Sequence, residues 1–308
     1  MKKGLKMLKI IIPAIIIVIL VAFCIFLWWF PSIIVTGKRQ TLEEAFAWQT
    51  DHYDTSFYEP LEKEDYTVSG EGGYKLHAEL LVNPEKTDRY VIISHGYTDN
   101  RMGALKYVPM YLELGFNCII YDLRGHGENE PTYTTYGQLE GKDLNFLVRD
   151  TRERYPELTV LGLHGESLGG ATTIMSLNEK PEVDFVVSDC AFAGIEDVLK
   201  DGYRKVHIPM FLVDIADIGT RVRYKTSYKN MRPITSLAEN EIPVLFLHGA
   251  DDELIVPKNA ETMAAETKGF SECHIIPGAG HAESILKEPE LYREYVEEFL
   301  KEIHIGMN

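Results

Sequence analysis

From residue 66 onwards, short runs of apolar residues alternate with segments whose apolar residues recur every three or four positions. The runs predict buried strands, and the spaced segments predict amphipathic helices. Two strands, Tyr66–Val68 and Lys75–Val82, flank the glycine-rich segment 70–73, which predicts a hairpin. Six further strands are expected at residues 90–94, 117–121, 159–164, 185–188, 244–248 and 272–276. Continuously apolar strands separated by helices predict an α/β fold, with an eight-stranded, mostly parallel sheet covered by helices on both faces.

The N-terminus follows a different pattern. Residues 10–30 form 21 consecutive uncharged positions, and as a helix they would extend about 32 Å, close to the thickness of a bilayer core. Four lysines precede this run, within residues 1–9, and they outweigh Lys38 and Arg39 on the other side. The positive-inside rule therefore predicts a single-pass cell-membrane protein, with residues 1–9 cytoplasmic and the remainder extracytoplasmic. A cleaved signal peptide is the alternative, and bulky Trp28 and Trp29 at its expected cleavage region disfavour it.

Between this helix and the α/β domain at 65–308, residues 31–64 form a connector. Apolar positions at Leu42, Ala45 and Phe46 predict a short amphipathic helix in this connector, packed on the domain. Inside the domain, residues 191–242 make a gap between strands that is too long for an ordinary connection. This gap predicts a small helical cap, which either covers the substrate or packs on the edge of the sheet.

Charge and composition exclude several classes of partner. Six of the 31 Lys and Arg precede residue 41, which leaves 25 against 47 Asp and Glu, a formal charge of −22 for residues 41–308. Such an acidic domain disfavours nucleic acids and anionic lipid surfaces. The four cysteines form no CxxC pair, and neither HExxH nor a His/Cys cluster is present, so we expect no metal and no cofactor.

The strongest chemical signal is Gly165-Glu166-Ser167-Leu168-Gly169, directly after the apolar run 159–163. A Gly-x-Ser-x-Gly between a buried strand and a helix, here expected at 168–177, forces a tight turn that exposes the serine hydroxyl at the strand's end. Ser167 is therefore the candidate nucleophile. A glycine-rich turn without chemistry is the alternative.

A serine hydroxyl needs a base to take its proton, and that base needs an orienting acid. His281 is the candidate base, because it lies in a glycine-rich loop between the last strand and the final helix. Asp252, in the loop after the penultimate strand, is the candidate acid, with Asp251 as runner-up and Asp189 as a more distant alternative. The backbone N–H groups of Tyr97 and Leu168 are the expected oxyanion donors.

Four motifs, in this order, resemble those of the serine α/β-hydrolase family, and in particular its membrane-anchored bacterial, lysophospholipase-like or ABHD-type branch. They are Ser94–Tyr97, Tyr121–Gly127, Gly165–Gly169 and Gly278–His281. The resemblance implies an α/β-hydrolase fold from about Tyr66 to Ile303. Two positions depart from the family pattern: Asn129 stands where Ser is usual, and Val256-Pro257 follows the acid one residue late, which keeps Asp251 open.

These residues predict a membrane-tethered serine hydrolase that cleaves carboxylic esters of small molecules or lipids through an acyl-enzyme. Lysophospholipase, thioesterase and amidase activity on the same three residues are alternatives, as is a non-catalytic binding protein on a hydrolase scaffold. Acyl-chain length, natural substrate and oligomeric state leave no signal in the sequence.

Overall fold

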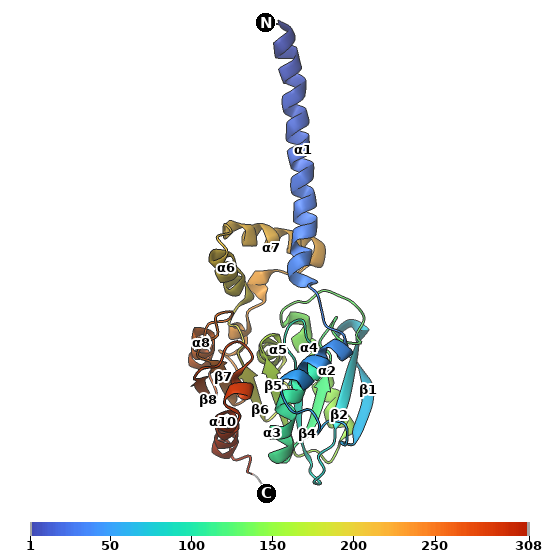
Figure 1. Ribbon diagram of the computed structural model, residues 1–308, viewed down its shortest axis with the longest axis vertical. Helices are drawn as coiled ribbons and strands as arrows, with labels where there is room; N and C mark the ends of the chain where they lie inside the picture. The colour runs from blue at the N-terminus through green and yellow to red at the C-terminus, as the bar shows by residue number, and fades with distance from the viewer. Residues whose placement is uncertain (1, 307–308) are drawn as a thin grey trace.

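The computed structural model describes residues 2–306, which form a long N-terminal helix and an α/β body (Figure 1). Helix α1 (Lys2–Val35) projects away from the body. Its segment Ile11–Val35 is the one stretch within residues 2–306 that is long and apolar enough to cross a membrane. Residues 11–25 of this segment are exposed, whereas Pro31 and Val35 at its end near the body are buried. The helix continues five residues beyond the predicted end at Phe30. Residue 1 of the predicted 1–9 segment and residues 307–308 lie outside the described residues.

An eight-stranded sheet forms the centre of the body, in the order β1-β2-β4-β3-β5-β6-β7-β8. Strand β2 alone runs against its neighbours, and β3 to β8 are parallel. The predicted sheet is thus confirmed. The strands are β1 Lys63–Ser69, β2 Lys75–Leu81, β3 Arg89–Ser94, β4 Asn117–Tyr121, β5 Val160–Glu166, β6 Phe185–Asp189, β7 Val244–Gly249 and β8 Ser271–Ile276.

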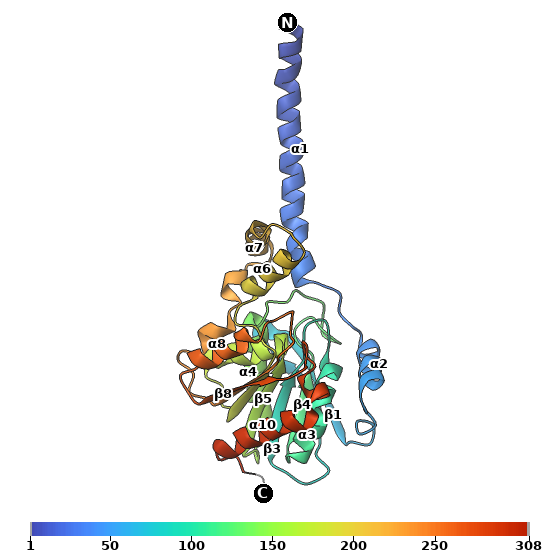
Figure 2. The ribbon, with the colours of Figure 1, turned by 60° about the vertical axis from the view of Figure 1, so that its left-hand side comes forward.

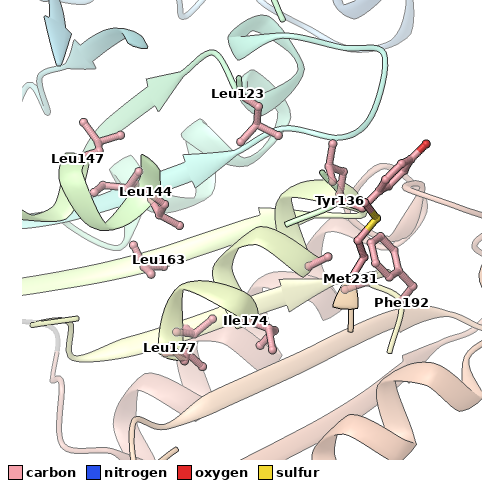
Figure 3. Close-up of a cluster of buried hydrophobic side chains, with 14 of the residues drawn as sticks. Leu123, Tyr136, Leu144, Leu147, Leu163, Ile174, Leu177, Phe192 and Met231 are labelled. Carbon is pink, nitrogen blue, oxygen red and sulfur yellow. The ribbon is translucent and has the colours of Figure 1, made fainter. Parts of the chain in front are cut away.

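Helices cover both faces of the sheet, because its central strands are apolar on both sides. Side chains from α4, α5 and α8 share one core cluster with the sheet, part of which Figure 3 shows, and side chains from α2, α3 and α10 share the other. The helices of the body are α2 Leu42–His52, α3 Val108–Glu113, α4 Gln138–Arg154, α5 Leu168–Ser176, α6 Ile195–Lys205, α7 Phe211–Tyr224, α8 Lys258–Glu266, α9 Ser284–Lys287 and α10 Pro289–Glu302.

Residues 191–242, which we call the cap, form α6 and α7 and two short 3-10 turns. Phe192 and Tyr228 are buried in the core cluster on the α5 face, whereas α7 packs against the lower end of α1 (Figures 1 and 2). The cap therefore connects the body to α1.

The parallel strands place their carboxyl ends at one edge of the sheet, where ligand sites of open α/β folds form. Strand β5 ends at Glu166, β6 at Asp189 and β7 at Gly249. The loops that follow these strands carry the residues that the motifs singled out.

Candidate active site

Ser167 lies in a strained turn between β5 and α5. Its backbone has φ 53° and ψ −111°, a conformation that residues with a side chain rarely adopt. The flanking glycines make the turn possible: a Cβ on Gly165 would lie 2.2 Å from the carbonyl oxygen of Gly169, and a Cβ on Gly169 would lie 2.1 Å from that of Ser94. Strain of this kind persists where the surrounding structure enforces it, and it is common at active sites.

Three side chains from three different loops meet at this turn. The hydroxyl of Ser167 lies 2.9 Å from Nε2 of His281, and Nδ1 of His281 lies 2.7 Å from Oδ2 of Asp252. An ionised carboxylate only accepts hydrogen bonds, so Nδ1 carries the proton and Nε2 is free to accept the hydrogen bond of the serine. The arrangement is a continuous chain of donors and acceptors, which can carry a proton away from Ser167.

The geometry separates the three acids considered as partners of His281. Asp252 contacts His281 directly and is buried, whereas the adjacent Asp251 is exposed. The carboxylate of Asp189 instead accepts a hydrogen bond from the hydroxyl of Tyr107 at 3.0 Å. Residues 249–252 form a turn, in which consecutive side chains point in different directions, so only one of Asp251 and Asp252 faces the histidine.

A second histidine, His248, holds Asp252 in place, a role that the motifs in the sequence did not predict. Nε2 of His248 lies 3.1 Å from Oδ2 of Asp252, while Oδ1 accepts the backbone N–H groups of Leu254 and Ile255. Burial alone would raise the pKa of Asp252, but the hydrogen bonds from His248 and His281 lower it well below its usual range. The acid therefore stays ionised. Asp252 follows His248, near the end of β7, by four residues, and this spacing is the signal for the contact in the sequence.

Two backbone N–H groups near the serine, of Leu168 and Tyr97, are not used by the fold itself. Within residues 2–306, neither has a protein acceptor. Leu168 is the first residue of α5, whose N–H groups have no partner inside the helix. Gly96, next to Tyr97, lies so near Ser167 that an added Cβ would be 3.8 Å from the serine Cβ. Both N–H groups thus belong to the immediate surroundings of the serine.

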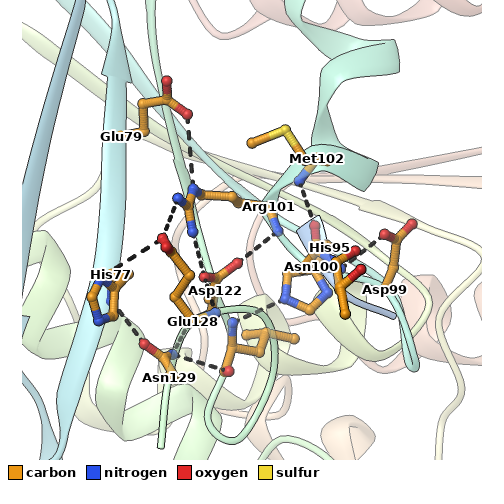
Figure 4. Close-up of polar contacts among 12 residues, drawn as sticks. His77, Glu79, His95, Asp99, Asn100, Arg101, Met102, Asp122, Glu128 and Asn129 are labelled. Carbon is orange, nitrogen blue, oxygen red and sulfur yellow. Dashed lines mark hydrogen bonds and ion pairs between the residues drawn. The ribbon is translucent and has the colours of Figure 1, made fainter. Parts of the chain in front are cut away.

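A buried polar network supports the loop that carries Tyr97 (Figure 4). The backbone N–H of Leu123 donates to Nε2 of His95 at 2.9 Å, and Nδ1 of His95 bonds the carbonyl of Gly96 at 2.7 Å. Burial lowers the pKa of His95, which keeps the ring neutral as these bonds require. Arg101 and Asp122 form an ion pair of 2.6 Å beneath the same loop.

Asn129, which departs from the family pattern, takes part in this network. Its side-chain oxygen accepts the backbone N–H of His77 at 2.9 Å, and its amide donates to the carbonyl of Asp122 at 2.7 Å. With Asn at this position, the turn after β4 remains hydrogen-bonded to strand β2 through His77.

Tyr97 also links the site to the end of α1. Its hydroxyl donates to the carbonyl of Ile34 at 3.0 Å and accepts the N–H of Gly37 at 3.1 Å. A backbone hydrogen bond of 2.8 Å from Gln40 to Thr98 adds to this contact. We call residues 34–41 the α1 junction. The sequence offered no sign that this junction would reach the serine loop.

Lys106 and Glu166 form a buried ion pair behind Ser167. Burial alone would lower the pKa of Lys106, but Glu166 raises it above its usual value. Nζ of Lys106 also donates to the carbonyl of Ala282 at 3.0 Å, directly after His281. The pair therefore braces the histidine loop against the turn that holds the serine.

A cavity of about 670 Å³ opens beside Ser167 and His281. Trp48 and His52 of α2 line it, together with Leu254 and Leu286. Its size suits an organic molecule of moderate size. Among its lining residues, all within the described chain, none comes from the cap, so this cavity gives no support to the first of the two alternatives for the cap, that it covers the substrate. The connector helix takes that place, because α2 packs beside the loop after β3.

Residues 104–303 match the model of the prolyl oligopeptidase family, the S9 peptidases. The chain belongs to this family. Its members are serine α/β-hydrolases, so the match agrees with the strand order and with the serine turn described above. The predicted family resemblance and fold are thereby confirmed, and the chain is a serine hydrolase.

Several relatives share most of the chain. YqkD of Bacillus subtilis, which is uncharacterized, is 31% identical over 277 residues that cover 88% of this chain and 90% of YqkD. WAV2 of Arabidopsis thaliana, an α/β-hydrolase domain-containing protein, is 24% identical over a match that covers 77% of this chain and 78% of WAV2. Among solved structures, the esterase Pf2001 of Pyrococcus furiosus superimposes with a TM-score of 0.66 at 24% identity, over 83% of this chain and 97% of the esterase. That likeness supports the fold.

Proposed function

We propose that this family member hydrolyses carboxylic esters with Ser167 as nucleophile, His281 as base and Asp252 as the orienting acid. The observation that carries the proposal is the unbroken hydrogen-bond chain from the serine hydroxyl through His281 to a buried, ionised Asp252. Residues 65–308 are the catalytic domain in this proposal, and the connector at 31–64 contributes Trp48 and His52 to its cavity.

The reaction proceeds in two halves. Nε2 of His281 takes the proton of Ser167 as the hydroxyl oxygen attacks the ester carbonyl, and the N–H groups of Tyr97 and Leu168 bind the oxyanion that forms. His281 then gives the proton to the departing alcohol, which leaves an acyl-Ser167. Water, deprotonated by the same nitrogen, releases the acid and restores the serine. Asp252 remains ionised throughout and stabilises the imidazolium.

The proposal includes an uncleaved membrane anchor, residues 10–30, with the N-terminus cytoplasmic and the hydrolase domain outside the cytoplasm. Two features favour an anchor over a signal peptide: α1 runs without interruption to Val35, and its last turn is bonded to the body through Ile34. Cleavage near Trp28 and Trp29 would break α1 where Arg223 of α7 bonds the carbonyl of Trp28.

Esters are favoured over amides as substrates because the solved structures with the same fold include several esterases, such as Est1E of Butyrivibrio proteoclasticus, with a TM-score of 0.62. The name of the family gives amide or peptide hydrolysis as the second candidate. Hydrolysis of p-nitrophenyl esters and of matched p-nitroanilides by the full-length protein separates the two. We expect ester turnover, with a preference for one acyl length set by the cavity, and faster anilide turnover would favour the peptidase.

A direct test of the catalytic residues is the Ser167→Ala variant, with Ser188→Ala, a buried serine at the end of β6, as control. We expect the first to lose ester hydrolysis and the second to keep it, because Ser188 has no part in the proton relay. Activity retained by Ser167→Ala would refute the mechanism. Folded protein that is inactive in all forms would favour a binding role.

A further inference from the structure

The cap carries an exposed apolar surface that the proposed reaction does not use. Six large apolar side chains between residues 206 and 222 are 40–62% exposed, and they make up six of the ten such side chains found after α1 in the described chain. We call them the α6–α7 apolar surface: Val206, Ile208, Met210, Phe211, Ile218 and Val222. Apolar side chains that cluster in this way on a soluble body indicate a binding surface.

The surface forms one stripe along α7. Ile218 and Val222 follow Phe211 by seven and eleven positions. At about 100° per residue, these three side chains point within roughly 20° of one direction. Val206, Ile208 and Met210 lie in the turn that leads from α6 into α7 and extend the stripe. The sequence of α7 thus presents one face to the core, through Val213 and Ala216, and another to the surroundings.

α7 lies at the level where α1 would leave a membrane. Gly219 touches α1 so closely that an added Cβ would lie 2.3 Å from the carbonyl oxygen of Leu27 and 2.5 Å from Cγ of Pro31. Trp28 and Trp29, exposed at this level, are residues typical of the membrane interface. The 18 residues from Ile10 to Leu27 rise about 27 Å, which matches the bilayer core. Figures 1 and 2 show α7 lying across the lower end of α1.

The charge of this segment also differs from that of the whole chain. Residues 200–232 contain eight Lys and Arg and three Asp, a formal net charge of +5, whereas the full chain carries −16. Arg223 donates to the carbonyl of Trp28 at 2.7 Å, and its guanidinium lies 5.0 Å from the indole ring. Basic side chains that flank an apolar stripe are typical of helices that lie in a membrane surface and meet its phosphate groups.

We propose that the α6–α7 apolar surface lies in the headgroup region of the membrane that α1 crosses, with α7 parallel to the membrane plane. The inference rests on the proposed membrane anchor. The bilayer is the occupant because the α6–α7 apolar surface adjoins the spanning helix and because the segment 200–232 that carries it has a net positive charge. Two attachments, α1 and the cap, then hold the body in one orientation, and the contact of Gly219 of α7 with α1 fixes the angle between the two helices.

Site-specific quenching tests this placement in the full-length protein. A bimane fluorophore is attached at Phe211→Cys in a Cys24→Ser, Cys273→Ser background, since the other two cysteines are fully buried. The protein is reconstituted in phosphatidylcholine vesicles with or without phosphatidylglycerol. The matched control is Phe270→Cys, an exposed aromatic at the amino end of β8, and Val18→Cys reports on the anchor.

We expect doxyl-labelled lipid to quench the label at 211 at least about twofold more than the label at 270, and aqueous iodide to do the reverse. Equal lipid quenching at 211 and 270 would overturn the proposal, and so would a label at 211 that is shielded from iodide but not quenched by lipid, since that result indicates a second protein copy. Quenching at 18 without quenching at 211 leaves the anchor intact and refutes the cap's placement. Ester hydrolysis by the same vesicles reports separately on the proposed function.

Discussion

Replacing Asp252 by Asn should disable the enzyme through hydrogen-bond geometry as well as charge. The carboxylate accepts four hydrogen bonds: two imidazole N–H groups, of His248 and His281, at one oxygen and two backbone N–H groups at the other. An amide has one oxygen and one NH2 group, which donates. In either orientation, the NH2 group therefore faces two N–H groups that need an acceptor. If the NH2 faces His281, the ring must carry its proton on Nε2 and can no longer accept the proton of Ser167.

The expected loss in kcat is about 10³–10⁴-fold, equivalent to about 4–5.5 kcal/mol of transition-state stabilisation, because in triads of this kind the neutral amide enforces the wrong tautomer. The assay is p-nitrophenyl ester hydrolysis under saturating substrate. Asp251→Asn is the matched control: its side chain is exposed, and we expect kcat within about twofold of wild type. An Asp252→Asn variant that keeps more than a tenth of wild-type kcat, or an equal loss in Asp251→Asn, would refute the assignment.

Three further predictions concern the surroundings of the site. Burial raises the pKa of Asp189 to about 6, so the folded state holds this proton more tightly than the unfolded state. The free energy of unfolding should therefore fall by about 3 kcal/mol as pH rises from about 4 to 6. Urea denaturation should show a smaller fall for Asp189→Asn, whereas a variant at an exposed position, Asp88→Asn, should behave like wild type. Gly169→Ala should destabilise the protein by at least about 1–3 kcal/mol or prevent folding, because its Cβ would lie 2.1 Å from a β3 carbonyl oxygen, and a wild-type melting temperature would contradict this. Tyr97→Phe removes both hydrogen bonds to the α1 junction, worth about 1 kcal/mol each, and should lower kcat severalfold with KM little changed; an unaltered kcat would exclude the junction from positioning the loop.

The sequence predicted the parts of the molecule that depend on local pattern. Apolar runs gave the strands with ends within about three residues, because buried parallel strands must be continuously apolar. The turn at Ser167 followed from glycine spacing, since the close approach of Gly165 to Gly169 tolerates no Cβ. The predicted chain order of nucleophile, acid and base, Ser167, Asp252 and His281, corresponds to the loops after β5, β7 and β8, which meet at the carboxyl edge of the sheet.

Other features depend on contacts between distant segments, and no local pattern encodes them. The choice between Asp251 and Asp252 required the direction of each side chain. Trp48 lines the cavity only because α2 folds back beside the loop after β3. The apolar residues of the cap are compatible, in the sequence, with a position over the substrate, and only the structure shows that α7 packs against α1. Apolar composition predicts that a surface will be covered but does not indicate by what.

Reaction with a fluorophosphonate measures the central claim most directly, because only a serine activated by its base attacks phosphorus readily. The folded full-length protein is treated with the probe, digested and examined by mass spectrometry, with a His281→Gln variant beside it. The account predicts one adduct, on the peptide that contains Ser167, and much slower labelling in the variant. An adduct at another serine, no labelling of the folded protein, or equally fast labelling without His281 would contradict it.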